Sequence, residues 1–227
     1  MATLGLIGSG NIGGTLARLA VDAGLDVVLS NSRGPQTLSA LVDELGPQAR
    51  AATPAQAAAA GDWVVVTIPV GAIGTVPREP LAGKTVIDTG NYYAPRDGTI
   101  PELEAQELTD SELLQRHLAG AHVVKAFNNI HSPHLRALPR PAGAADRTAL
   151  PIAGNDPDAK KRATELISLL GYDSVDMGPL TESWRSQVGT PAFCAPYAVT
   201  KNDQYRNQPA APASAAEIEA ALASARR

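Results

Sequence analysis

The feature that most limits the fold of this chain is a short apolar run that leads directly into a glycine-rich turn and a helical pattern. Residues 3–7 are apolar, and Gly8-Ser9-Gly10-Asn11-Ile12-Gly13 fits the spacing G-x-G-x-x-G. In such a turn the first glycine permits a tight bend, the second lets the backbone approach a pyrophosphate, and the third lets the helix pack close to the strand. The helix N-terminus that follows favours phosphate. Because a second predicted strand at 26–30 completes the unit, we interpret the turn as a dinucleotide-binding site.

The residues after the second predicted strand indicate which dinucleotide binds. An NAD site carries Asp or Glu here, hydrogen-bonded to the ribose 2′-hydroxyl, but no carboxylate lies between Asp26 and Asp43. Asn31, Ser32 and Arg33 fill the position instead. A guanidinium and a hydroxyl can both donate hydrogen bonds to a 2′-phosphate. The sequence therefore predicts NADP(H); the alternative is a surface arginine that only precedes the next helix.

Strands that alternate with helices predict the fold class. Near-continuous apolar runs at 62–69, 84–88 and 122–127 are typical of strands buried on both faces of a parallel sheet. Helical patterns lie between the strands, including one at 36–45 and one at 101–118. We expect an α/β protein with a doubly wound parallel sheet, a Rossmann fold, and a small C-terminal α/β lobe.

The second half of the chain predicts the division into units. A stretch rich in Pro, Ala and Arg at 133–149 indicates a loop or boundary, and a strand–helix–strand pattern follows it. We expect an NADP-binding Rossmann domain at 1–140 and the small lobe at 141–205. The low-complexity segment that follows predicts a flexible or marginally helical tail at 206–227.

Composition excludes several kinds of partner. The net charge is −4 and the basic residues are scattered, so we expect no nucleic acid. A single cysteine, Cys194, cannot form an intrachain disulfide and has no neighbours for a metal site, so we expect no metal. No apolar stretch approaches the roughly 18 residues of a membrane span, and the N-terminus lacks the pattern of a leader. We expect a soluble, cytoplasmic protein with a small-molecule redox substrate.

The ends of the predicted parallel strands should meet at one edge of the sheet and form the ligand site. Residues 67–69 would be a stiff wall against the ribose and nicotinamide, and the asparagines after the fifth and sixth strands could bind the carboxamide or a substrate. The alternative is that these asparagines are ordinary turn residues. The predicted cofactor-binding residues are Gly8, Ser9, Gly10, Asn11, Ile12, Gly13, Asn31, Ser32, Arg33, Thr67, Ile68, Pro69, Asn91 and Asn128.

Acid–base groups near these strand ends are scarce, and no catalytic residue is assigned. His131 could reach the cleft or belong to a solvated loop, and Lys125 is either paired within its buried strand or aimed at the cleft. The chain has no Tyr-x-x-x-Lys pair on a helix and no Ser-His-Asp set. Hydride transfer between two redox cofactors needs close rings and little proton chemistry from the protein.

Several segments together resemble the family of NADPH-dependent coenzyme F420 oxidoreductases, which includes many proteins known only as dinucleotide-binding. The similarity extends over about residues 3–200. The segments that carry it are Gly8-Ser9-Gly10-Asn11-Ile12-Gly13, Ser30-Asn31-Ser32-Arg33-Gly34-Pro35, Thr67-Ile68-Pro69, Lys125-Ala126-Phe127-Asn128-Asn129-Ile130, Ile152-Ala153-Gly154-Asn155-Asp156 and Asp176-Met177-Gly178-Pro179-Leu180.

The resemblance implies hydride transfer between NADP(H) and a deazaflavin, in a cleft between a Rossmann domain and a small C-terminal lobe. It implies that Ser9, Ser32 and Arg33 hold the 2′-phosphate, residues 11–12 the pyrophosphate and residues 68–69 the nicotinamide side. It also makes a homodimer plausible.

The resemblance further implies that residues 178–180 help to form the pocket of the second ring. Two segments that face this second substrate, 91–93 and 127–130, differ from the best-known members. A similar nucleotide module occurs in flavin-linked metalloreductases, which also have a membrane domain that we do not expect here. Two alternatives therefore stay open: an NADPH-dependent reductase of a small carbonyl, imine or flavin, with His131, Lys125 or a tyrosine as proton donor, and an NADP(H) sensor without turnover.

Overall fold

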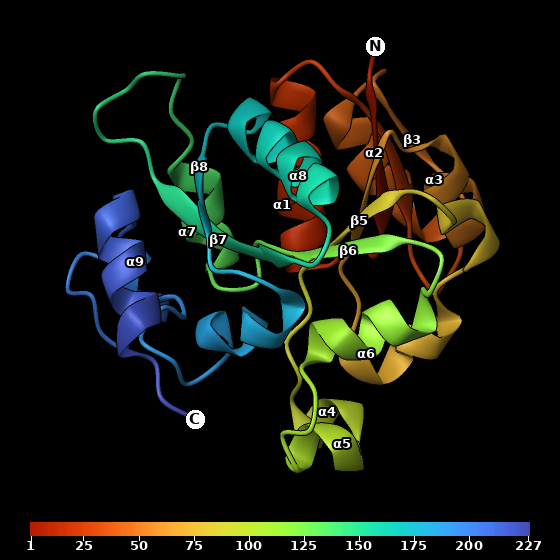
Figure 1. Cartoon of the computed structure of the whole chain (residues 1–227). Helices are drawn as coiled ribbons and strands as arrows, with labels where there is room; N and C mark the ends of the chain where they lie inside the picture. The colour runs from red at the N-terminus through yellow and green to blue at the C-terminus, as the bar shows by residue number, and fades with distance from the viewer.

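The computed structural model describes all 227 residues and places eight strands in one sheet (Figure 1). The strands are β1 (Thr3–Ile7), β2 (Asp26–Ser30), β3 (Ala49–Ala51), β4 (Trp63–Val66), β5 (Thr85–Asp88), β6 (His122–Lys125), β7 (Ala149–Gly154) and β8 (Asp173–Asp176). Their order is β3-β2-β1-β4-β5-β6-β7-β8, and every neighbouring pair is parallel except β6 and β7. The predicted doubly wound α/β fold is confirmed.

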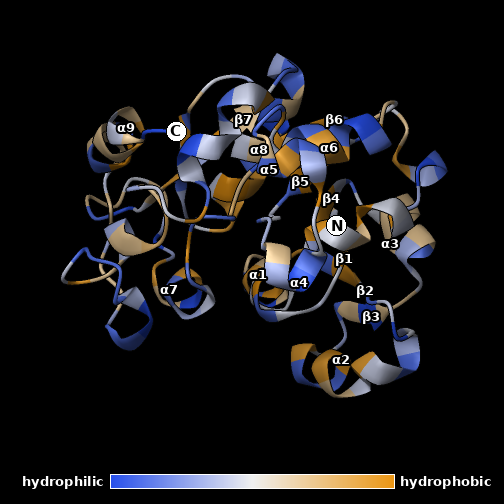
Figure 2. Cartoon of the chain, turned by 90° about the horizontal axis from the view of Figure 1, so that it is seen from below, coloured by the Kyte–Doolittle hydropathy of each residue, from blue (hydrophilic) through white to orange (hydrophobic).

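Nine α-helices connect or flank the strands: α1 (Asn11–Asp22), α2 (Ser39–Leu45), α3 (Pro54–Ala60), α4 (Ala94–Asp97), α5 (Pro101–Glu104), α6 (Asp110–His117), α7 (Ser132–Ala137), α8 (Pro157–Leu169) and α9 (Ala215–Ser224). Helices α1 and α8 lie on one face of the sheet and α6 on the other (Figure 1). Figure 2 shows hydrophobic and hydrophilic residues mixed along α1, α2 and α6, as expected of helices that pack one side against a sheet. None of the helices has the length and apolar composition needed to cross a membrane.

Alternate residues of each central strand supply two separate cores. In β4, Trp63 and Val65 belong to the cluster on the α1 and α8 face, whereas Val64 and Val66 belong to the cluster on the α6 face. All four side chains are buried. This two-residue alternation, apolar on both faces, is the reason that the strand reads as a continuous apolar run in the sequence.

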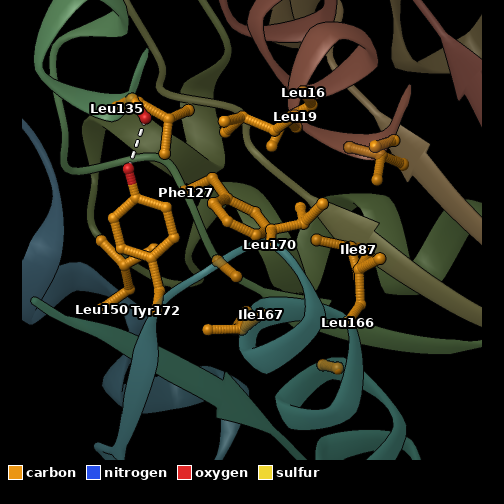
Figure 3. Close-up of a cluster of buried hydrophobic side chains, with 14 of the residues drawn as sticks. Leu16, Leu19, Ile87, Phe127, Leu135, Leu150, Leu166, Ile167, Leu170 and Tyr172 are labelled. Carbon is orange, nitrogen blue, oxygen red and sulfur yellow. Dashed lines mark hydrogen bonds between the residues drawn. The ribbon is translucent and has the colours of Figure 1, made fainter. Parts of the chain in front are cut away.

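The larger core joins the two halves of the chain. Phe127, Leu166 and Tyr172 are fully buried within it, together with side chains of α1 (Figure 3). The phenol of Tyr172 donates a hydrogen bond to the backbone carbonyl of Leu135, which gives the buried hydroxyl a partner.

The point at which strand order reverses fixes the place of the ligand site. Strand β1 pairs with β2 on one side and with β4 on the other, so the chain winds first one way and then the other from β1. The loops after the carboxyl ends of β1 and β4 therefore diverge and leave a crevice, which is where ligands bind in open α/β sheets.

One predicted helix is wrong as a single element. The pattern at 101–118 forms two short helices, α5 and α6. Between them Gln106 has a positive φ of 55°, which a helix does not accommodate. Thr109 and Glu112 then form a capping box that starts α6 afresh.

The C-terminal half has a helix where a loop was expected, and its tail contains a helix, the second of the two alternatives expected for it. The segment at 133–149, expected as a loop, begins with helix α7, which has Pro133 in its first turn. In the tail, a capping box between Ser214 and Glu217 starts helix α9, and this helix buries Ile218 and Leu222. Strand β7 pairs with β6, so the sheet continues across residue 140; the proposed division into units stays a prediction.

Matched substitutions on α8 test the larger core. Leu166 is fully buried and Leu169, one turn away, is 50% exposed. We expect Leu166→Ala to lower the free energy of unfolding by about 2–5 kcal/mol, because it leaves a cavity. Leu169→Ala should change it by only about 0.5 kcal/mol. Urea denaturation measures both, and equal losses would contradict the assignment of α8's inner face.

Candidate functional site

The turn between β1 and α1 depends on its glycines for different reasons. Gly8 has a φ of +110°, and a Cβ atom there would lie 2.2 Å from the carbonyl oxygen of Thr67. A Cβ at Gly13 would lie 2.3 Å from the Gly8 carbonyl oxygen, so α1 can approach the turn only with glycine there. A Cβ at Gly10 would meet no protein atom within 4 Å. The turn is thus tight on the protein side and open at Gly10, beside the N-terminus of α1.

The loop after β2 leaves two hydrogen-bonding groups free. The Asn31 side chain accepts a hydrogen bond from the Arg33 backbone N–H (3.0 Å) and donates one to the Thr37 hydroxyl (2.8 Å), which orders the loop. The Ser32 hydroxyl and the Arg33 guanidinium have no hydrogen bond or ion pair within the protein, and both residues are exposed. Both groups are therefore available to an anion.

A cavity of about 300 Å³ lies at the carboxyl ends of the central strands and begins at the glycine turn. The turn forms one side of it, and the segment 67–69 after β4 forms another. Predicted site residues that line the cavity are Gly10, Asn11, Ile12, Thr67, Ile68, Pro69, Asn91, Asn128 and His131. The structure brings together the ends of β1, β4, β5 and β6, as the topology requires.

Other predicted residues lie outside this cavity. Gly8 and Gly13 face the protein backbone, at Thr67 and at Gly8 respectively, and not the cavity. Ser9 faces a neighbouring open hollow of about 610 Å³ that is bordered by α1, α2 and α7. Asn31, Ser32 and Arg33 belong to the β2 loop and line neither hollow.

Part of the wall comes from residues 193–206 and not from the C-terminal segment that the resemblance implied. Residues 178–180, expected near the second ring, do not line the cavity, and Leu180 is fully buried elsewhere. The backbone N–H of Cys194 instead donates a 2.7 Å hydrogen bond to the carbonyl of Asn129, which brings this part of the chain to the strand ends. Tyr93, in the segment 91–93 that was expected to face the second substrate, lines the cavity; the lining residues that the sequence did not reveal include Arg96, Phe193, Cys194, Tyr205 and Arg206.

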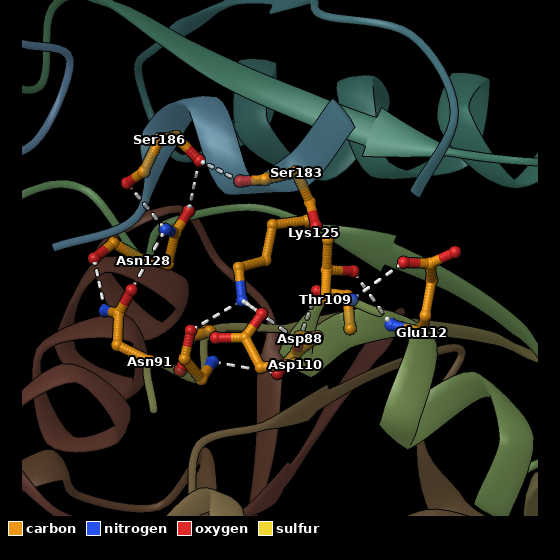
Figure 4. A network of polar contacts seen from close by, with 12 residues as sticks. Asp88, Asn91, Thr109, Asp110, Glu112, Lys125, Asn128, Ser183 and Ser186 are labelled. Atoms are coloured by element: carbon orange, nitrogen blue, oxygen red, sulfur yellow. Dashed lines mark hydrogen bonds and ion pairs between the residues drawn. The ribbon is translucent and has the colours of Figure 1, made fainter. Parts of the chain in front are cut away.

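Two of the predicted asparagines are tied to each other. Asn91 Nδ2 donates to the carbonyl of Asn128 (2.8 Å), and Asn128 Nδ2 donates to the carbonyl of Ser186 (2.9 Å), as Figure 4 shows. Asn128 is only 4% exposed. These contacts hold the loops after β5 and β6 at a fixed separation, so the asparagines have a structural role besides any contact with a ligand.

Lys125 is paired rather than aimed into the cavity. Its fully buried ammonium contacts Asp110 Oδ1 (2.8 Å), Asp88 Oδ2 (3.3 Å) and the Gly90 carbonyl (2.6 Å) (Figure 4). Burial alone would lower the pKa of Lys125, but the two carboxylates raise it, so the ammonium stays charged. Because Lys125 does not line the cavity, it acts as a positioning residue for the loop at Gly90.

The titratable side chains that line the cavity are held uncharged, apart from its arginines. Burial, and then the nearby His134 and Arg206, lower the pKa of His131, so this imidazole is neutral at pH 7. Burial raises the pKa of Cys194 to about 12 and also raises the pKa of Tyr93 and Tyr205. The phenols and the thiol therefore keep their protons at neutral pH, and none of them is a ready base or nucleophile. The structure contains no group of three or more His, Cys, Asp or Glu side chains that could hold a metal ion.

The sequence and the fold are similar to those of known proteins. Residues 3–92 match the family described as NADP oxidoreductase, coenzyme F420-dependent. The crystal structure of the hypothetical protein SMa0349 from Sinorhizobium meliloti has a TM-score of 0.73 and 31% identity, and covers 85% of this chain and 93% of that one. A structure from Arthrobacter sp. FB24, described as "a putative f420 dependent nadp-reductase", has a TM-score of 0.66 and 27% identity, and covers 81% of this chain and 87% of that one.

A curated relative extends the comparison to a longer protein. Metalloreductase STEAP3 of Rattus norvegicus is 28% identical over 182 residues, which are 79% of this chain and 34% of that protein. The chain therefore spans about a third of the length of this relative.

Two alanine substitutions separate the structural glycine from the ligand-facing one. We expect Gly13→Ala to lower the free energy of unfolding by about 1–3 kcal/mol, because its Cβ meets backbone. Gly10→Ala should alter stability by about 0.5 kcal/mol or less yet weaken NADPH binding roughly tenfold, which is about 1.4 kcal/mol. Urea denaturation without nucleotide and NADPH titration measure the two effects. Unchanged NADPH affinity in Gly10→Ala would show that the nucleotide does not approach this residue.

Proposed function

Because this chain belongs to the family of coenzyme F420-dependent NADP oxidoreductases, we propose that it transfers a hydride between NADP(H) and a deazaflavin such as coenzyme F420. In the reducing direction the C4 hydride of NADPH passes to the deazaflavin ring, and a proton from solvent completes the reduction. The protein's task is to hold the two rings face to face.

The free groups of the site support one placement of the nucleotide. The pyrophosphate lies over Gly10 at the N-terminus of α1, where the backbone is open and the helix dipole favours an anion. The 2′-phosphate reaches the exposed Ser32 and Arg33, which have no partner within the protein. The nicotinamide then enters the cavity beside Ile68 and Pro69.

The observation that carries the choice of chemistry is that aromatic and apolar side chains line the cavity beside residues 67–69 and that no carboxylate and no lysine does. Burial lowers the pKa of its one histidine, His131, so this imidazole is a poor proton donor at neutral pH. Reduction of a carbonyl needs a proton delivered to its oxygen as the hydride arrives, whereas hydride transfer to a deazaflavin does not require a protein acid.

One unpaired atom, the Nδ1 of His131, favours a second candidate, the reduction of a small carbonyl, imine or flavin. His131 lines the cavity, and its buried Nδ1 has no hydrogen-bond partner in the protein. A polar substrate could supply that partner and use the imidazole as its proton donor.

Mixing the protein with NADPH and coenzyme F420 tests the proposed function. We expect NADPH-dependent loss of the deazaflavin absorbance, with loss of activity in Gly10→Ala as the nucleotide site weakens. Absence of bleaching over a range of pH would contradict the proposal. Turnover of carbonyls or imines that falls in His131→Gln would establish the second candidate instead, and tight NADPH binding without turnover of any acceptor would indicate a sensor.

Charge reversal at Arg33 tests the 2′-phosphate contact. A charge-assisted hydrogen bond contributes about 1.5–3 kcal/mol, so Arg33→Asp should weaken NADPH binding by roughly tenfold to a hundredfold. NADH binding should change far less, because NADH lacks this phosphate. Arg50, exposed on β3, provides the matched control Arg50→Asp with the same change of net charge. Equal losses for NADPH and NADH in fluorescence titrations would remove Arg33 from the site.

A further inference from the structure

A second cavity, of about 210 Å³, lies beside the loop after β5. Its walls come from residues within 103–110 and 184–188, and Asn91 is the one residue that it shares with the cavity at the nucleotide turn. Its volume is below the range of about 300–1,000 Å³ that is usual for pockets of drug-sized ligands, so an occupant must be small. The proposed function gives this second cavity no ligand.

The chain segment on one side of the second cavity is strongly acidic. Residues 101–112 include five carboxylates and no lysine or arginine. Two of these carboxylates, Glu104 and Asp110, line the cavity. One oxygen of Glu104 accepts a hydrogen bond from the Tyr92 hydroxyl (2.7 Å), and the other makes no hydrogen bond within the protein. The cavity therefore favours a positively charged occupant.

The buried charge cluster behind the cavity wall adds to this preference. It contains two carboxylates, Asp88 and Asp110, for one ammonium, that of Lys125 (Figure 4). Asp110 is 6% exposed and contacts the ammonium through Oδ1. Burial, together with the nearby Asp88, raises the pKa of Asp110 more than Lys125 lowers it. One carboxylate at the cavity wall is thus incompletely neutralised, and a cation in the cavity would stabilise its charged form.

An aromatic side chain of the second cavity already holds a guanidinium. The guanidinium carbon of Arg227 lies 5.2 Å from the ring centre of Trp184, within the range of a cation–π contact. Arg227 lines the cavity and makes no hydrogen bond or ion pair within the protein. Arg185 also lies over this ring, at 4.7 Å, but it pairs with Glu182 and does not line the cavity. The chain's own Arg227 shows which kind of group fits against this wall.

From these observations we propose that the second cavity binds a small organic cation with a guanidinium group, held against Trp184 and the carboxylates of Glu104 and Asp110. The side chain of Arg227 occupies part of the same place and competes with this ligand. An organic cation suits the site better than a metal ion, because an indole ring forms one wall and no group of three metal-ligating side chains is present. The site is separate from the proposed function and borders the nucleotide cavity at Asn91.

Methylguanidinium and methylurea test the inference, because the two are similar in size and shape and only the first is charged. The indole N–H signal of Trp184 in NMR spectra, identified by its loss in Trp184→Phe, reports on the cavity. Trp63 is the internal reference, since its Nε1 donates to the Arg162 carbonyl (2.9 Å) far along the sheet. We expect methylguanidinium to shift the Trp184 signal saturably and to bind at least about tenfold more tightly than methylurea, with the Trp63 signal unchanged.

Three substitutions predict different changes in the affinity for methylguanidinium. Glu104→Gln keeps an acceptor for the Tyr92 hydroxyl and should weaken binding about tenfold. The matched control Glu107→Gln removes the same charge from an exposed residue that does not line the cavity, and it should leave binding nearly unchanged. Arg227→Gln should strengthen binding about threefold, because it removes the competing guanidinium.

Each other outcome would overturn the inference. Equal binding of the two compounds, or no shift of the Trp184 signal, would show that the cavity does not recognise a guanidinium. Equal losses in Glu104→Gln and Glu107→Gln, or parallel shifts of both indole signals, would reveal a general effect of charge or salt. An affinity that does not rise in Arg227→Gln would show that Arg227 and the ligand do not share a place. None of these measurements depends on hydride transfer, so they stand apart from the test with coenzyme F420.

Discussion

The close contact between the glycine turn and the end of β4 is the constraint on which the rest of the site depends. With no side chain at Gly8 or Gly13, the backbone of the turn lies against Thr67 and α1 starts directly beside it. The N-terminus of α1 is thereby aimed into the crevice where strand order reverses, and the segment 67–69 becomes its opposite wall. The turn packs against protein backbone at Gly8 and Gly13, whereas no protein atom lies within 4 Å of a Cβ placed at Gly10.

A buried charge cluster gives the second half of the site its rigidity. Lys125 of β6 links Asp88 of β5 to Asp110 of α6 and also holds the Gly90 carbonyl. Burial of ions costs several kcal/mol each unless their partners are well placed. Lys125 offsets part of this cost with contacts of 2.6–3.3 Å, and the Ser111 hydroxyl donates a 2.7 Å hydrogen bond to Asp88. Burial still raises the pKa of Asp110. The hydrogen bond from Lys125 to the Gly90 carbonyl holds the loop after β5, and the next residue in this loop, Asn91, lines the cavity.

The cavity is built from two parts of the chain. The glycine turn and residues 67–69 lie within residues 3–92, which match the family model. Much of the remaining lining, from Tyr93 and Arg96 to Tyr205 and Arg206, lies beyond that range. The chain is similar both to a structure described as a putative F420-dependent NADP reductase and to part of a metalloreductase, so the fold alone does not specify the acceptor.

The sequence alone determined the α/β class, the glycine turn and the positions of the strands, because these depend on short-range patterns of glycine and apolar residues. It also indicated a loop suited to NADP(H), since the absence of a carboxylate at 31–33 is local information. The partners of Lys125, the break between α5 and α6 and the arrival of residues 193–206 at the cavity were decided only by tertiary structure. Lys125 is 37 residues from Asp88 in the sequence, and residues 193–206 are further still from the nucleotide turn. Such contacts arise from how the elements pack, and no local periodicity encodes them.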